Sequence, residues 1–194
     1  MSLDLPANAL GIDFGTSNST VGWWRPGMPS LLPLEDGKIT LPSALFFNYE
    51  EHRLVFGRLA LHEYLEGYEG RLLRSLKSLL GSSLLKSETT VLGSAVPFKK
   101  ILGLFLTELK QCGEAFAGRP FEQAVIGRPV FFVDDNPAAD KEAADTLLGV
   151  ARASGFKDVS QGLADGQGIQ PGADFRAFVE PRRYDTTNQT FEGG

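Results

Sequence analysis

One short segment near the N-terminus restricts the possible fold more than any other part of the sequence. Residues 11–24, GIDFGTSNSTVGWW, contain two apolar runs separated by six small or polar residues. Short apolar runs bounded by glycine and asparagine are typical of β-strands. The segment therefore predicts two adjacent strands joined by a compact polar loop, with Asp13 close to the end of the first strand.

The residues of this loop are suited to holding an anion. Gly15 permits a tight turn and a close approach of a ligand to the backbone, and Thr16, Ser17 and Asn18 supply hydroxyl, amide and backbone N–H donors. A carboxylate beside a phosphate would repel it unless a cation lay between them. Mg²⁺ commonly contacts one or two carboxylates together with waters and phosphate oxygens. The pattern therefore indicates that Asp13 holds Mg²⁺ through water, beside phosphates bound by residues 15–18.

A simpler interpretation of the same residues is a plain β-hairpin in which Asp13 bonds to the backbone of the turn. The loop is not a Walker loop, because no Gly-Lys-Ser or Gly-Lys-Thr follows it, and it does not have the G-x-G-x-x-G pattern either. The residues alone leave both interpretations open.

The first third of the chain has the composition of an antiparallel meander, and the middle has that of helices. Helical spacing is clearest over 98–117, where one face is formed by Leu102, Phe105, Leu106, Leu109 and Phe116. The predicted strands are 9–14, 19–24, 30–34 and 43–49, and the predicted helices of this part are 58–65, 71–80 and 98–117.

Residues 122–160 have the pattern of a strand–helix–strand unit. Asn136 can cap the helix, with a proline at its first position. The core face of this helix is predicted to hold Ala144, Leu147, Leu148 and Ala151. The predicted fold is therefore α/β, with a meander followed by a crossover unit on a mixed sheet and with flanking helices.

Composition excludes several classes of function. The net charge of −5 argues against a general nucleic-acid surface, which requires clustered lysine and arginine. The single cysteine, Cys112, excludes an internal disulfide and has no neighbouring histidine to activate it as a nucleophile. No apolar run is long enough to span a membrane, and the N-terminus lacks the features of a signal peptide. We expect a cytoplasmic protein without a nucleic-acid or membrane partner.

The loop segment resembles the first phosphate loop of the actin/sugar-kinase/heat-shock superfamily, and within it the DnaK-type heat-shock chaperones. Further segments resemble segments of those chaperones and follow in the same order along roughly residues 8–160. The segment QAVIGRPVFF is most similar to the YegD-like branch. These segments are LEDGKITLPSALFF (34–47), RLVFGRLA (53–60), LKSLLG (76–81), GEAFAGRPFEQAVIGRPVFFVDDN (113–136) and VARASGF (150–156).

The resemblance implies an actin-like ATPase (ribonuclease H-like) lobe that binds ATP or ADP with Mg²⁺. It places Asp13 near Mg²⁺ through water and residues 15–18 around the β- and γ-phosphates. It implies that Lys77 is the catalytic lysine that reaches the γ-phosphate, and that Pro129 relays the nucleotide state to the rest of the chaperone. On the residues alone, Lys77 would be a solvated helix lysine and Pro129 a strand terminator.

The sequence departs from the family after residue 160. The Glu-Pro-x-Ala-Ala-Ala helix and the second, Asp-x-Gly-Gly-Gly-Thr phosphate loop do not follow, and residues 161–194 are glycine-rich without a clear period. We expect residues 8–160 to form the N-terminal lobe only and 161–194 an irregular or disordered tail. The parent protein would be an ATPase acting on a client or with a co-chaperone, whereas this chain alone would bind nucleotide weakly and hydrolyse it negligibly.

Two other functions remain open from the sequence. A sugar or metabolite kinase of the same superfamily would share the first phosphate loop. A non-enzymatic binding module would account for the missing second lobe.

Overall fold

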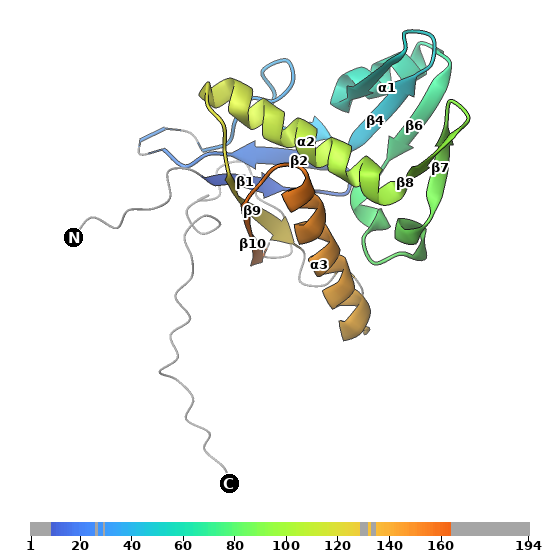
Figure 1. Ribbon diagram of the computed structural model, residues 1–194. Coiled ribbons are helices and arrows are strands. Elements are labelled where there is room, and N and C mark those ends of the chain that lie inside the picture. The colour runs from blue at the N-terminus through green and yellow to red at the C-terminus, as the bar shows by residue number, and fades with distance from the viewer. Residues whose placement is uncertain (1–8, 26, 29, 129–131, 133–134, 164–194) are drawn as a thin grey trace, which may run out of the picture.

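The computed structural model describes residues 9–25, 27–28, 30–128, 132 and 135–163 (Figure 1). Its strands are β1 (Ala9–Asp13), β2 (Asn18–Gly22), β3 (Leu41–Pro42), β4 (Ala44–Asn48), β5 (Arg53–Phe56), β6 (Gly70–Arg74), β7 (Glu88–Val91), β8 (Ser94–Pro97), β9 (Gln123–Arg128) and β10 (Asp158–Leu163). Its helices are α1 (Gly57–Leu65), α2 (Phe98–Ala117) and α3 (Pro137–Ala153), with short 3₁₀ turns η1 (Leu76–Leu79) and η2 (Ser83–Lys86).

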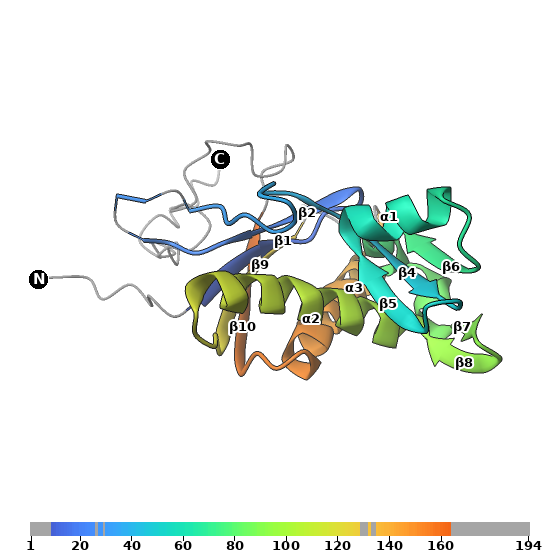
Figure 2. The same cartoon turned by 90° about the horizontal axis from the view of Figure 1, so that it is seen from above.

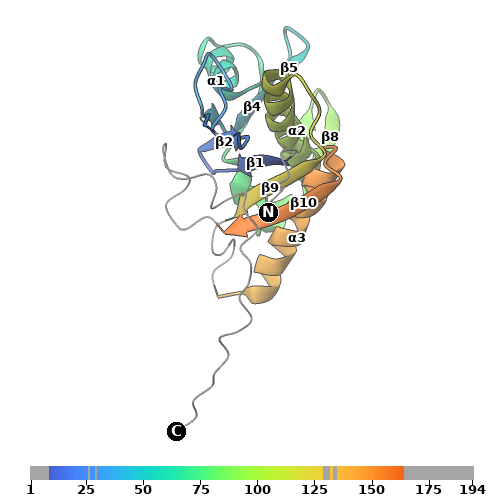
Figure 3. The ribbon, with the colours of Figure 1, turned by 90° about the vertical axis from the view of Figure 1, so that its left-hand side faces the viewer.

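The main sheet is mixed and has the strand order β10-β9-β1-β2-β3, most of which can be followed in Figure 3. Strands β1, β2 and β3 form an antiparallel meander, whereas β9 and β10 run parallel to β1. Helices α2 and α3 contact each other and lie along the same side of this sheet (Figure 2). The predicted fold class is confirmed, and the architecture is consistent with an actin-like ATPase lobe.

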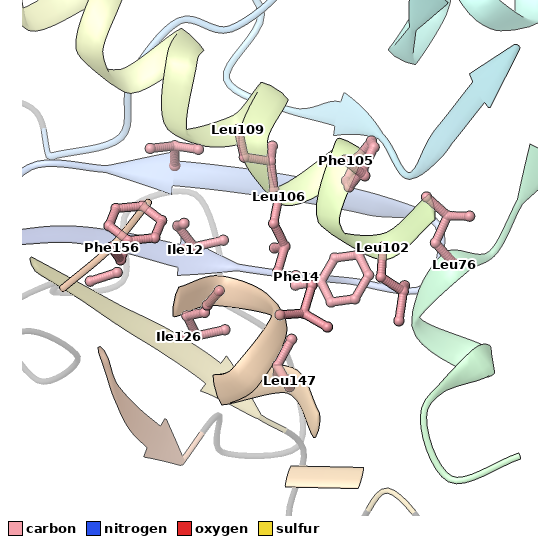
Figure 4. Close-up of a cluster of buried hydrophobic side chains, with 14 of the residues drawn as sticks. Ile12, Phe14, Leu76, Leu102, Phe105, Leu106, Leu109, Ile126, Leu147 and Phe156 are labelled. Atoms are coloured by element: carbon pink, nitrogen blue, oxygen red, sulfur yellow. The ribbon is translucent and has the colours of Figure 1, made fainter. Parts of the chain in front are cut away.

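The core lies between this sheet and the helices α2 and α3 (Figure 4). Four of the five predicted core positions of α2 are fully buried, and Ile12 and Phe14 from the β1 side meet them. The prediction for Phe116 is wrong, because its side chain is 43% exposed. This residue lies in the last turn of α2, where the Arg25 guanidinium packs over its ring at 5.2 Å from the centroid. On α3, Ala144, Leu147 and Ala151 are buried as predicted and Leu148 is partly buried against the core.

A second, smaller sheet has the order β5-β4-β6 and carries α1. Two carboxylates hold this helix in place. Glu35 accepts hydrogen bonds from the backbone N–H groups of Arg58 (2.8 Å) and Leu59 (2.9 Å) at the helix N-terminus. Buried Glu63 accepts one from the Asn48 side-chain amide on β4 at 2.7 Å. The helix is therefore bonded both to the segment before β3 and to the central strand of its own sheet.

The predicted helix over 71–80 is wrong. The chain instead forms β6, which pairs antiparallel with β4 from Gly70 to Arg74, and then the 3₁₀ turn η1. Leucine, arginine and lysine favour helices locally, but pairing with a neighbouring strand overrides this preference. Ser75 has a left-handed backbone (φ 54°), which separates the strand from the turn.

Two other parts of the chain differ from the prediction. Residues 30–34 contribute only an isolated bridge between Gly22 and Leu31, although Leu32 is fully buried. The hairpin β7–β8 was not predicted, because its residues have no marked apolar alternation. None of the helices among the described residues combines the length and the hydropathy that a membrane span needs.

Candidate functional site

The polar loop predicted between the first two strands is formed by the residues that connect β1 to β2. Strand β1 ends at Asp13 and β2 begins at Asn18, so the chain reverses within four residues. Phe14 is fully buried, and its ring lies 5.9 Å from that of Phe105 on α2. Thr16, Ser17 and Asn18 are exposed. The loop, defined here as residues 15–18, is thus anchored in the core at one end and open to solvent along the rest.

Gly15 is required by close contact within the loop. A β-carbon placed on this residue would lie 2.0 Å from the backbone oxygen of Asn18. Such a distance is impossible for two non-bonded atoms, and the obstacle is backbone, which cannot rotate away. The loop therefore curls back on itself at Gly15, as an anion-binding turn requires.

Lys77 and Asp13 are far apart in the sequence but are brought together by the fold. Lys77 lies in η1, directly after the buried Leu76, and is itself partly buried. Burial lowers the pKa of Lys77 below its ordinary value of 10.5, and the negative charge of Asp13 opposes this shift. This effect of Asp13 indicates that the Lys77 ammonium is close enough to the Asp13 carboxylate to interact with it electrostatically.

The surroundings of Asp13 fit a hydrated Mg²⁺. Asp13 pairs with Thr20 across β1 and β2, so both side chains lie on the same face of the sheet. The Thr20 hydroxyl is buried and has no hydrogen-bond partner among the described residues. A buried hydroxyl of this kind normally bonds to water or to a ligand. The residues thus offer one carboxylate and one hydroxyl, a set that suits an ion which retains several waters.

The carboxyl end of β9 lies beside the end of β1, because Gly127 pairs with Asp13 in parallel register. Ligands commonly bind at the carboxyl ends of parallel strands. Pro129 follows this strand but lies outside the described residues. The described residues contain no group of three or more histidine, cysteine, aspartate and glutamate side chains that could hold a metal.

Two residues of the loop's surroundings were missed by sequence reasoning. Ser19 and Ser43 are both buried, and their hydroxyl oxygens lie 2.9 Å apart. Ser43 belongs to the segment TLPSALFF, which resembles the chaperones, but the resemblance implied no role for this residue. Pairing of Ser19 with Leu41 across β2 and β3 is what brings the two hydroxyls together, and no local pattern reveals it.

Cys112 is unsuited to nucleophilic chemistry. Its thiol lies 3.7 Å from the Glu108 carboxylate one turn earlier on α2 and donates to it. Burial, followed by the charge of Glu108 and a smaller effect of Glu35, raises the pKa of Cys112 from 9.0 to about 12. The thiol therefore stays protonated near neutral pH, as expected for a residue that fills space.

We predict that Cys112 in the folded chain reacts slowly with iodoacetamide at pH 8, roughly a hundred-fold or more slower than in the urea-unfolded chain. The stability that the protonated thiol contributes is fully present below pH 9.0 and is lost as the pH rises toward a pKa of about 12. Glu108→Gln removes the nearest negative charge and should speed the reaction. Equal rates in the folded and unfolded chains would contradict the assigned environment.

The chain was compared with models of known protein families. Residues 9–99 match the family model described as Hsp70 protein. The matched region contains the 15–18 loop, both serines, the second sheet and Lys77. It supports a nucleotide-binding domain of the chaperone-ATPase type. Together with the mixed sheet and its antiparallel meander, the match supports placing this region in the Hsp70 and actin-like ATPase family.

Proposed function

We propose that the chain is the N-terminal lobe of a DnaK-like, YegD-like chaperone ATPase and that it binds the phosphates of Mg-ATP or Mg-ADP at the 15–18 loop. The observation that carries this proposal is the tight polar turn at Gly15, directly after β1, whose last residue, Asp13, acts electrostatically on Lys77. A cation, a carboxylate and a turn of backbone donors are the three parts that a magnesium-bound polyphosphate requires. The lobe, expected from the sequence over residues 8–160, would extend to Leu163, because β10 pairs with β9 up to that residue.

Each residue then has a separate task. The exposed loop residues Thr16, Ser17 and Asn18 would donate to phosphate oxygens, and Lys77 would bind the γ-phosphate. Asp13, with Thr20 beside it, would hold the waters of Mg²⁺. When bound, the ion would neutralise charge on the phosphates.

The two lobes of an actin-like ATPase lie on either side of the nucleotide. In the complete domain, hydrolysis would change the angle between the lobes and so control a client or co-chaperone. Pro129 would relay this change to the rest of the chaperone. The lobe alone would bind nucleotide weakly, because it contacts the phosphates from one side only.

We predict that Lys77→Ala weakens binding of Mg-ATP about ten- to a hundred-fold, the range expected for loss of one charge-assisted hydrogen bond. Isothermal titration calorimetry with the full chain measures this affinity. The pKa of Lys77 lies below its ordinary value of 10.5, so the ammonium is protonated at lower pH and loses its proton as the pH rises through that lowered pKa, and the affinity should fall over the same range. Asp13→Asn should remove most of the dependence on Mg²⁺.

Lys86→Ala is the matched control, because Lys86 lies in the neighbouring 3₁₀ turn η2 and pairs with Glu142 at 2.8 Å. It removes one positive charge of the same kind and should leave the affinity unchanged. Equal affinities of the wild type and the Lys77 and Asp13 variants would show that the assigned roles are wrong. Absence of Mg-ATP binding by the wild type would overturn the proposed function.

A further inference from the structure

We propose that the buried hydroxyl of Ser43 positions the 15–18 loop and couples it to the sheet that carries Lys77. The part of this inference that concerns nucleotide rests on the proposed function. Ser43 lies between β3 and β4 and is a positioning residue, since it acts on the loop and not on the nucleotide itself.

The hydrogen bonds around Ser43 form a closed ring. The Ser43 hydroxyl donates to the Gly15 carbonyl at 2.7 Å, and the Gly15 N–H donates to the Ser19 hydroxyl oxygen at 3.3 Å. A serine hydroxyl carries a single hydrogen. The Ser43 hydroxyl donates its hydrogen to the Gly15 carbonyl. The hydrogen bond of 2.9 Å between the two serine hydroxyls must therefore have Ser19 as its donor and Ser43 as its acceptor. Both backbone polar groups of Gly15 are thereby held.

The ring changes the role of Gly15 in the site. Its N–H is used within the protein, so the donors assigned to phosphate are those of residues 16–18. Ser43 and Ser19 are 2% and 0% exposed, and removing either hydroxyl would leave a buried polar group without its partner. The loop should therefore lose its shape when one member of the ring is replaced by alanine.

A second hydrogen bond joins Ser43 to the loop, and the chain after Ser43 leads toward Lys77. The Ser43 N–H donates to the Ser17 carbonyl at 2.9 Å, so Ser43 holds the loop at two points. Strand β4 begins at the next residue, and its first residue, Ala44, pairs with Arg74 at the end of β6. Lys77 follows shortly after in η1. A shift of the loop therefore displaces the start of β4 and, through β6, the lysine.

The test compares the full-length wild type with Ser43→Ala, Ser43→Thr and Ser154→Ala. Ser154 is the matched control, because it also has a partly buried hydroxyl that bonds to backbone carbonyls. This hydroxyl donates to the Val150 carbonyl on α3 at 3.0 Å and lies 3.2 Å from the Gly103 carbonyl on α2. Amide hydrogen exchange of residues 15–18 is measured without nucleotide, and affinity for Mg-ATP is measured by calorimetry. Thermal melting checks that each variant is folded.

We expect Ser43→Ala to exchange about ten-fold faster in the loop and to bind Mg-ATP about ten-fold more weakly, as for one lost buried hydrogen bond. Ser43→Thr retains the hydroxyl and should restore both values, and Ser154→Ala should match the wild type. A Ser19→Ala and Ser43→Ala double variant should be no worse than either single variant, because one break already opens the ring.

The inference would be overturned if amide hydrogen exchange of residues 15–18 in Ser43→Ala were as slow as in the wild type. It would also be overturned if the increases in exchange rate of the two single variants added fully in the double variant. Faster exchange with unchanged Mg-ATP affinity would overturn its nucleotide part. Absence of nucleotide binding by the wild type would instead overturn the proposed function, and the exchange data would still decide whether Ser43 holds the loop.

Discussion

A Gly15→Ala variant is expected to lose about a hundred-fold in affinity for Mg-ATP while the rest of the chain stays folded. The added β-carbon would lie 2.0 Å from the Asn18 backbone oxygen, so the loop backbone must move. That movement also breaks the ring through Ser19 and Ser43. Loss of two or more donor contacts to phosphate, each worth about 1.5 kcal/mol or more, gives a change of this size.

Calorimetry measures the affinity, and far-ultraviolet circular dichroism with thermal melting shows that the fold is retained. Gly103→Ala is the control, because a β-carbon there would meet only the Val150 side chain, at the ordinary contact distance of 3.8 Å. Its affinity should equal that of the wild type. A Gly15→Ala chain that binds Mg-ATP normally would show that phosphate is not held by the 15–18 loop.

The parts of the fold that could be predicted from the sequence are those specified by nearby residues. The apolar spacing of Leu102, Phe105, Leu106 and Leu109 defines one face of a helix, and this face is buried in the structure. The loop after Asp13 could be predicted because glycine and hydroxylic residues interrupt two apolar runs. In both cases the signal lies within a few residues of the element that it predicts.

Other features depend on contacts between distant segments. Residues 71–80 have the composition of a helix, and only pairing with β4 makes their first half a strand. That pairing also carries Lys77 to Asp13, so its position depends on the second sheet and not on local spacing. Resemblance to a family singled out Lys77, whereas the residues alone favoured a solvated lysine.

The serine ring shows the same limit in the site itself. Ser19 and Ser43 are common small residues in strands, and nothing in their immediate neighbours marks them. Their hydroxyls meet because β2 pairs with β3 and because the 15–18 loop turns toward both. A sequence pattern could therefore predict where the polar loop lies, but not which buried side chains give the loop its shape.

The largest loss of stability is expected for Gly113→Val, in the part of α2 that crosses the main sheet. Gly113 is buried, and even a β-carbon there would lie 2.7 Å from Leu10 on β1 and 3.3 Å from Val21 on β2. The two further methyl carbons of valine have no space between helix and sheet. We expect the free energy of unfolding to fall by about 3 kcal/mol, at the upper end of the usual cost of overpacking a core. The melting temperature should fall by roughly 6–12 °C.

The control is Gly149→Val, which makes the same replacement in the interior of α3, where a β-carbon would meet nothing within 4 Å. Valine has a slightly better helix propensity than glycine, so this variant should be unchanged or more stable by about 0.3 kcal/mol. Urea unfolding of both variants measures the difference. Because helix propensity acts equally at both positions, the difference between the two variants reports how closely α2 approaches β1 and β2. A loss of similar size in both would mean that valine in a helix, and not this close approach, causes the effect.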